Sequence, residues 1–340
     1  MESLDIPQTG ILPTFIMGVI AYCFILTCNL TILLTIALDH KLHKPMYILL
    51  FNLPVNDLMG ATALFPQLIA SIHLQNRNIS FPACVFQALM VHLYCGGALI
   101  ILTVMAYDRY VAICQPLHYH TVMTPRNLRR MTVGIWVTDV VLIGVLFIML
   151  TPFSFCQNLI ADMYCNNPSI MKLTCEIAAV NNAYGLFLSV FLQGVSTIVV
   201  IFTYIQILKT CLLNKQADTK SKAIRTCATH LVVFIVFQVT TIFSVLSHRF
   251  SQVSPYLRRS GVSTIVVIFT YIQILKTCLL NKQADTKSKA IRTCATHLET
   301  HTKPSYEAPH VPPVSLLTGA PLRETQTKPS YEVATTGALT

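Results

Sequence analysis

Charged residues are scarce in this sequence. They make up 11% of its 340 residues, whereas a soluble domain contains about 25%. Hydrophobic residues make up 54% and gather in long runs, which predicts an integral membrane protein rather than a large soluble core. The formal net charge is +10. The basic residues lie in short loops and form no continuous stripe, which argues against nucleic acid as a partner.

Two further absences narrow the choice. No Cys-x-x-Cys pair occurs among the 12 cysteines, and His92 and Cys95, one helical turn apart, more often indicate packing than metal binding. We therefore expect no metal site, no catalytic residue and no enzymatic activity. The first ten residues carry Glu2 and Asp5 but no Lys or Arg, so we expect no cleavable signal peptide.

Six apolar runs are long enough to cross a membrane as helices, because about 20 residues rising 1.5 Å each span the hydrocarbon core. They are residues 11–38, 47–72, 85–107, 131–152, 184–208 and 223–246. Residues 261–280 are a seventh candidate, which predicts an all-α bundle of seven transmembrane helices. Lys and Arg gather after the first, third and fifth runs, which places those loops in the cytoplasm and the N-terminus outside. Arg249, Arg258 and Arg259 oppose this orientation next to the seventh candidate.

The seventh candidate is a copy of an earlier segment. Residues 194–231 return as residues 261–298, identical at all 38 positions. Ancient repeats of transporters diverge, and this copy begins and ends within a helix. We therefore interpret it as a recent duplication or a mis-assembled gene. The predicted divisions are 1–10, an extracellular N-terminus; 11–246, a six-span core; 247–260, an outer loop; 261–298, the duplicate with its cytoplasmic flank; and 299–340, a disordered tail rich in Pro, Thr and Ser.

Three strings of residues resemble the signatures of one family. They are "LHKPMYILLFNLPVNDL" at 42–58, "MAYDRYVAICQPLHY" at 105–119 and "SKAIRTCATHL" at 221–231. All are similar to odorant receptors, a branch of the rhodopsin-like G-protein-coupled receptors, over roughly residues 11–260. The resemblance implies a receptor that binds a small odorant outside and activates a heterotrimeric G protein of the olfactory stimulatory, cAMP-raising type inside. The N/D-P-x-x-Y motif of the family's seventh span occurs nowhere in the chain.

Asp108, Arg109 and Tyr110 place an acid and a base at the cytoplasmic end of the third run. An arginine there either pairs with its neighbour and switches on release, or reaches up to lipid headgroups. The longer string in which it lies favours the switch. By the resemblance, Tyr204 and Lys222 join these residues in coupling to the G protein.

Asp57 lies within the second run. An ionised acid in the middle of the membrane costs at least about 2.5 kcal/mol, so it is rarely accidental. It either makes a polar contact between helices, with Asn29 or Asn56, or, as the resemblance implies, binds an allosteric sodium ion. Many odorant receptors carry a second acid eleven residues before the Arg, where this chain has Ala98.

Four cysteines, Cys84, Cys156, Cys165 and Cys175, fall on the predicted outer side, where disulfides form. The sequence alone allows three pairings, and the resemblance selects Cys84–Cys165 and Cys156–Cys175. Asn78 begins an N-glycosylation triplet in the first outer loop. Six of the other cysteines are expected to remain small buried thiols: Cys23, Cys28, Cys95, Cys114, Cys211 and Cys227.

A ligand pocket is expected between the third, fifth and sixth spans, near their outer halves. Side chains one turn apart share a face of a helix, and the selected faces are mostly apolar with a few polar anchors, as is usual for small-molecule sites. About half of these residues are expected to line a cavity and the others to pack between helices. They are Val91, His92, Cys95 and Leu99; Gly185, Leu188, Ser189 and Leu192; and Gln238, Thr241, Ile242 and Val245.

Two alternatives to a receptor are considered. A transporter or channel would need ionisable residues along several spans, and Asp57 is taken as the only central one. A non-signalling membrane protein, made by a duplicated or mis-assembled receptor gene, is favoured by the missing N/D-P-x-x-Y motif. As a receptor, the chain is expected to be a multi-pass plasma-membrane protein with a cytoplasmic C-terminus. Its expected partners are an odorant, a G protein and the lipid bilayer.

Overall fold

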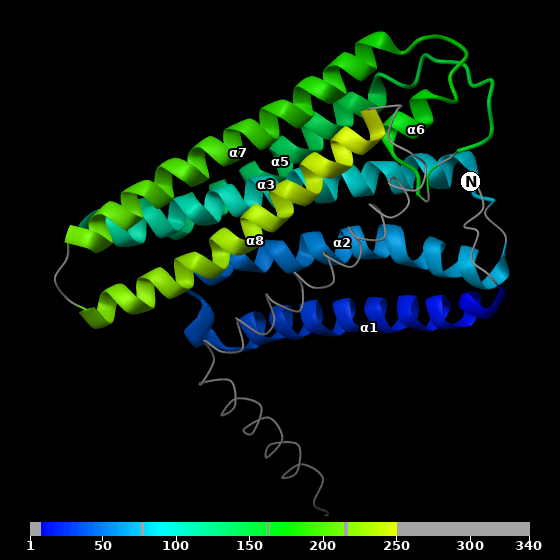
Figure 1. The fold of residues 1–340 in the computed structure, drawn as a ribbon. Helices are drawn as coiled ribbons and strands as arrows, with labels where there is room; N and C mark the ends of the chain where they lie inside the picture. Colours follow the sequence, from blue (N-terminus) through cyan, green and yellow to red (C-terminus); the bar gives the residue numbers. More distant parts are fainter. Residues whose placement is uncertain (1–7, 76–77, 161, 163, 214–216, 250–340) are drawn as a thin grey trace, which may run out of the picture. The chain divides into compact units, whose positions relative to one another are not determined.

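The computed structural model describes residues 8–75, 78–160, 162, 164–213 and 217–249. The candidate seventh span, its flank and the tail lie outside this part of the chain. Within it, the regular elements are helices, with one isolated antiparallel bridge between Phe155 and Thr174. The elements are α1 (Gln8–Leu38), the 3-10 turn η1 (His40–Leu42), α2 (Pro45–Leu74), α3 (Phe81–Cys114), α4 (Pro116–Val122), α5 (Pro125–Ile148), α6 (Asn167–Met171), α7 (Ala179–Leu213) and α8 (Ala217–Arg249) (Figure 1).

Six of these helices, α1, α2, α3, α5, α7 and α8, are long and apolar enough to cross a membrane. The six predicted spans and the all-helical membrane fold are therefore confirmed. Large apolar side chains cover their outward faces, for example Val190 and Ile198 of α7 and Val140 of α5. Lipid tails are as apolar as these side chains, so this exposure is the normal state of a helix in a bilayer.

The helices begin and end at residues that hydropathy does not reveal. Proline occupies the first turn of α2, α3 and α5, where its fixed φ suits a helix start and its missing N–H is not needed. Thr124 caps α5 by accepting a hydrogen bond from the Asn127 N–H at 3.3 Å. α5 therefore begins at Pro125 rather than 131. It ends at Ile148, and a turn follows where the prediction continued the span to 152.

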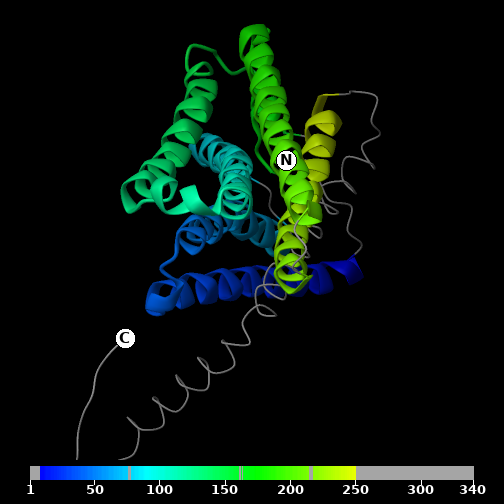
Figure 2. The same ribbon diagram turned by 90° about the vertical axis from the view of Figure 1, so that its left-hand side faces the viewer.

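Helix α3 lies at the centre of the described bundle (Figures 1 and 2). It packs against α2, α5, α7 and α8, while α1 packs against α2. Leu102 of α3 joins Leu53 of α2, Ile135 of α5, Val200 of α7 and Phe234 of α8 in one buried apolar cluster. A shift of α3 would therefore change its packing against four other helices.

Polar side chains connect these helices within the apolar core. Trp136 Nε1 of α5 donates to Asn52 Oδ1 of α2 at 2.9 Å. Asn56 Nδ2 of α2 donates to the Tyr94 carbonyl of α3, also at 2.9 Å. In a membrane such interhelical hydrogen bonds contribute about 0.6 kcal/mol each on average. Their larger effect here is to fix which faces of α2, α3 and α5 meet.

Candidate functional site

The segment between α5 and α7 is held in place by two disulfides. Cys84, at the start of α3, is bonded to Cys165, and Cys156 is bonded to Cys175. These are the two pairings that the resemblance implies. Gln87 of α3 strengthens the attachment, because its Oε1 accepts the Cys165 N–H at 2.9 Å. The second half of the segment is thereby anchored to the first turns of α3.

Hydrogen bonds organise the rest of this segment. The Asn166 side chain caps α6 by accepting the Ser169 N–H at 2.9 Å. Asn167 Nδ2 donates to Asn181 Oδ1 of α7 at 3.1 Å, and Asn181 Nδ2 donates in turn to the Leu146 carbonyl of α5 at 2.6 Å. Residues 166–168 are therefore placed over the space between α5 and α7.

Beneath this segment lies a cavity of about 230 Å³. Among the described residues that line it there is no Lys, Arg, Asp or Glu. It is therefore an apolar chamber with a few neutral hydrogen-bonding groups, a composition typical of small-molecule sites. Its lining includes these residues from the sequence prediction: Val91, His92, Cys95, Leu99, Gly185, Leu188, Ser189, Leu192, Thr241 and Val245.

Two residues predicted for the pocket, Gln238 and Ile242 of α8, are not part of its lining. Gln238 is buried, and its Nε2 donates to the Gln193 carbonyl at 3.1 Å and to the Thr197 hydroxyl at 2.5 Å on α7. Ile242 faces outward and is 43% exposed. The cavity-facing stripe of α8 runs one residue earlier than predicted, through Phe237 and Ser244.

Several cavity residues were missed by the sequence reasoning. Phe65 of α2 and Tyr94 of α3 line the cavity, and the Tyr94 and Phe237 rings meet edge to face with centroids 6.1 Å apart. Tyr164 lines it from the segment after α5, and burial raises its pKa well above the ordinary value. The Tyr164 hydroxyl therefore remains protonated. The observed set Phe237, Thr240, Thr241 and Ser244 has the same spacing as the predicted set, shifted by one residue, so helical periodicity alone could not phase α8.

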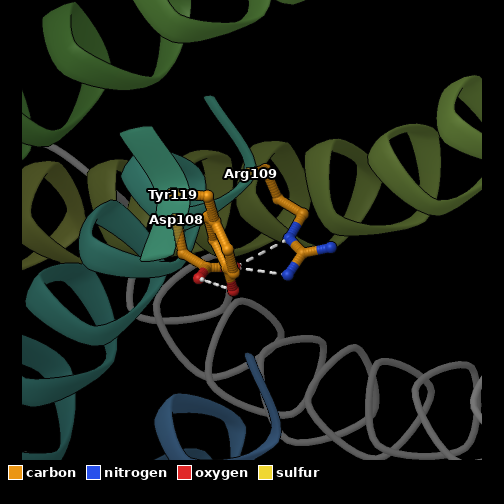
Figure 3. Close-up of polar contacts among 3 residues, drawn as sticks. All are labelled: Asp108, Arg109 and Tyr119. Atoms are coloured by element: carbon orange, nitrogen blue, oxygen red, sulfur yellow. Dashed lines mark hydrogen bonds and ion pairs between the residues drawn. The ribbon is translucent and has the colours of Figure 1, made fainter. Parts of the chain in front are cut away.

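At the other end of α3, Asp108 and Arg109 form an ion pair. Arg109 Nε donates to Asp108 Oδ2 at 3.0 Å, and the Tyr119 hydroxyl of α4 donates to Asp108 Oδ1 at 3.1 Å (Figure 3). The Asp108 side chain is 1% exposed and that of Arg109 19%. Burial, followed by the charge of Asp108, raises the pKa of Tyr119 to about 12. The phenol is therefore a permanent donor at neutral pH, a contribution that sequence reasoning missed.

The other residues predicted to couple to a G protein lie near the same end of the bundle. Tyr110 and Tyr204 pack against one apolar cluster that joins α3, α7 and α8. The Tyr204 hydroxyl donates to the Cys227 carbonyl of α8 at 3.0 Å and lies 2.7 Å from His230 Nδ1. Lys222 lies in α8, and its side chain is outside the described residues.

The buried acids differ from the prediction. Asp57 of α2 is buried, with 1% exposure. Asn29 Nδ2 donates to the Ile25 carbonyl, and Asn56 Nδ2 donates to the Tyr94 carbonyl. The expectation that Asp57 is the only central acid is wrong, because Asp139 of α5 is also completely buried. Hydropathy does not distinguish an apolar run with a single acid from an ordinary span, which is why Asp139 was overlooked.

The remaining predicted positions are placed as follows. Asn78 is exposed in the coil that precedes α3. Of the cysteines outside the disulfides, Cys28 and Cys227 are buried as expected, but Cys23 is exposed on α1. In the part of the chain that the structure describes, no three or more His, Cys, Asp or Glu side chains gather as a metal site would require.

Comparisons with known proteins agree with this geometry. A family model described as "Olfactory receptor" matches residues 18–260. Human Olfactory receptor 51E1 is 34% identical over 266 residues, covering 78% of this chain and 81% of the relative. Human Olfactory receptor 51B5 is 32% identical over 281 residues, covering 82% and 88%. The crystal structure of squid rhodopsin aligns with a TM-score of 0.64 at 15% identity, covering 81% of this chain and 78% of that one, which indicates the same fold.

Proposed function

Because the chain belongs to the olfactory receptor family of class A G-protein-coupled receptors, which are not enzymes, we propose that it is an odorant receptor. It binds a small odorant in the cavity and activates a heterotrimeric G protein of the olfactory stimulatory type, which raises cAMP. One observation carries this proposal: α3 lines the cavity with Val91 to Leu99 and holds the Asp108–Arg109 pair near its other end. Asp108 lies 17 positions after Val91, which corresponds to about 25 Å of continuous helix.

The odorant is neutral and largely apolar. A carboxylate or ammonium group in the cavity would lose its water without meeting an opposite charge among the described lining residues, and burying an unpaired charge costs several kcal/mol. The hydroxyls of Ser189 and Thr241 donate their protons to the Gly185 and Phe237 carbonyls, so their oxygens can accept a hydrogen bond from an odorant hydroxyl. Such recognition relies on shape and on one or two hydrogen bonds.

The resting receptor keeps Arg109 paired. Asp108 accepts from both Arg109 and Tyr119, so its charge is matched while the G protein is absent. Activation separates Arg109 from Asp108 and offers the guanidinium, beside Tyr110 and Tyr204, to the G protein. Lys222 adds a positive charge near the start of α8. The disulfide-bearing end faces the oxidising extracellular side of the plasma membrane, the Arg109 end and the C-terminus face the cytoplasm, and Asn78 carries the glycan.

Asp57 is the acid that the family resemblance assigns to an allosteric sodium ion. Ala98 stands where many family members supply a second acid, and no cluster of three or more acidic, His or Cys side chains exists among the described residues. These residues fit a sodium ion poorly. No step of the proposed activation therefore depends on sodium.

The duplicated segment supports a second candidate function. Residues 261–298 repeat residues 194–231 and lack the N/D-P-x-x-Y motif, so the chain can be a non-signalling membrane protein with a receptor-like core. We favour insertion of residues 261–280 as a seventh span, because they are mostly apolar and a basic flank follows them. Their side chains match the neighbours of the original helix rather than those of a seventh span.

Adjacent residues of α7 give a matched test of the cavity. Ser189 lines it, whereas Val190 is 64% exposed on the outward face. Ser189→Phe fills the cavity and should raise the half-maximal odorant concentration for cAMP at least ~10-fold, which corresponds to about 1.4 kcal/mol. Val190→Phe should leave it unchanged. If both variants respond to odorant with the same half-maximal concentration at equal surface level, this cavity is not the odorant site.

A second receptor separates the two candidate functions. It replaces residues 261–298 by the seventh span of Olfactory receptor 51E1, and both chains are tested against the same odorant panel. Responses from both chains support signalling by the natural one. A response from the restored chain alone would assign the natural chain to the non-signalling class.

A further inference from the structure

Three oxygen atoms in the middle of the bundle are buried without a donor. Asp139 of α5 and Asn56 of α2 are both completely buried. Neither carboxylate oxygen of Asp139, nor Oδ1 of Asn56, has a hydrogen-bond partner among the described residues. More than nine in ten buried polar groups in proteins are hydrogen-bonded, so this cluster requires an explanation.

The three oxygens converge on two consecutive glycines of α3. A Cβ atom built on Gly97 would lie 2.5 Å from Asn56 Oδ1 and 3.3 Å from Asp139 Oδ2. The two oxygens are therefore at most 5.8 Å apart, the sum of those two distances. Asp139 Oδ1 occupies the corresponding position over Gly96. Oxygens from α2 and α5 thus fill the volume that side chains of α3 would otherwise take.

The orientation of the Asn56 amide is fixed by its other end. Asn56 Nδ2 donates to the Tyr94 carbonyl at 2.9 Å. Rotating the amide by half a turn would bring Oδ1 against that carbonyl, two acceptors face to face, and would lose the bond. Asn56 therefore directs an acceptor, not a donor, to the side where Asp139 lies.

Facing acceptors need a hydrogen or a cation between them. An ionised carboxylate with no opposite charge is among the most costly groups to bury. A hard cation usually takes six or more oxygen ligands, whereas Asp139 and Asn56 supply three and the described residues contain no metal-binding cluster. A single proton on Asp139 removes the charge and supplies the missing donor.

We propose that Asp139 is a proton-binding site within the membrane. Its carboxyl group stays protonated at neutral pH, and its O–H donates to Asn56 Oδ1 over Gly97, directly or through one water, linking α5 to α2. Gly96 also lines the ligand cavity, so the site lies immediately behind the cavity wall. Asp139 is thus a positioning residue for the cavity-lining turn of α3 and keeps that wall uncharged. This inference does not depend on odorant binding.

Infrared spectroscopy of the full chain in lipid membranes tests the proposal. A protonated carboxylic acid has a carbonyl stretch distinct from that of a carboxylate, and this band should be present at neutral pH. Asp139→Asn, which keeps the shape of the side chain, should remove it. Asn56→Ala should shift it to higher frequency, because the acid loses its acceptor. Asp57→Asn is the matched control and should leave the Asp139 band in place.

Two results would overturn the proposal. Identical carbonyl bands in the wild-type chain and Asp139→Asn would mean that Asp139 is ionised. A melting temperature that rises when sodium chloride replaces choline chloride, with the rise abolished by Asp139→Asn but not by Asp57→Asn, would assign a cation to the site. If exchanging the two salts leaves the melting temperature unchanged, or changes it equally in the wild-type chain and in Asp139→Asn, no cation binds at Asp139. This result supports a proton at the site.

Discussion

Replacing Gly97 by Ala should destabilise the receptor far more than the same replacement at Gly144. The methyl group at Gly97 would meet Asn56 Oδ1 at 2.5 Å. An ordinary contact begins at 3.4 Å, so the amide must move by 0.9 Å, the difference between these distances. At Gly144 of α5, an added Cβ meets nothing within 4 Å.

The cost at Gly97 has two parts. Overfilling a packed site costs about 1–3 kcal/mol. A 0.9 Å displacement can also stretch the 2.9 Å bond from Asn56 Nδ2 to the Tyr94 carbonyl beyond hydrogen-bonding range, which adds about 0.6–1.7 kcal/mol in a membrane. Ala has a higher helix propensity than Gly, and this offsets up to about 1 kcal/mol of the destabilisation at each of the two glycines. The two variants should therefore differ by about 1.6–4.7 kcal/mol in the free energy of unfolding, at least a ~15-fold difference in the folded-to-unfolded ratio.

Thermal unfolding in lipid nanodiscs measures this difference. A thiol-reactive fluorogenic dye reports unfolding as buried cysteines such as Cys28 and Cys227 become accessible. Gly97→Ala should melt well below the wild-type chain, and Gly144→Ala at or slightly above it. If Gly97→Ala melts as high as Gly144→Ala, the close approach of Asn56 to α3 does not exist in the folded protein.

Two further predictions concern the ends of the bundle. The disulfide of Cys84 spans 81 residues and that of Cys156 spans 19, so loop-closure entropy gives them about 4.5 and about 3.2 kcal/mol. Cys84→Ser should therefore reduce surface labelling of intact cells more than Cys156→Ser, and the opposite order would contradict this account. Tyr119→Phe removes the neutral donor to Asp108, worth about 1 kcal/mol, and should raise odorant-independent cAMP about fivefold in the chain with a restored seventh span. An unchanged basal level would mean that Tyr119 does not hold the Arg109 pair.

Run length alone located the six spans, because about 20 apolar residues suffice to cross a bilayer. Their ends depend on local caps, such as Thr124 before α5, which hydropathy does not detect. The cavity faces of α3 and α7 followed from helical spacing, but on α8 Gln238 was chosen where Phe237 faces the cavity. Gln238 was assigned to the cavity because it is polar, whereas its side chain forms hydrogen bonds with the neighbouring helix α7.

Asp139 shows a different limit of sequence reasoning. Its role depends on Asn56, more than 80 residues away, and on the absence of side chains at Gly96 and Gly97. Those glycines were themselves a usable signal, because each costs about 1 kcal/mol relative to Ala inside a helix. Small residues at adjacent positions of a membrane helix often mark a close approach by a neighbour. No sequence pattern, however, says which neighbour approaches.

The contact from Tyr204 to Cys227 has a consequence for biosynthesis. It joins residues only 23 positions apart, and both lie inside residues 194–231, so the copy at 261–298 contains the same donor and acceptor in Tyr271 and Cys294. The original segment leaves the ribosome 67 residues ahead of its copy, a delay of about 3–13 s at about 5–20 residues per second. A hairpin of this length closes within microseconds to milliseconds. Translation order therefore gives α7 and α8 their correct partners before a competing sequence exists.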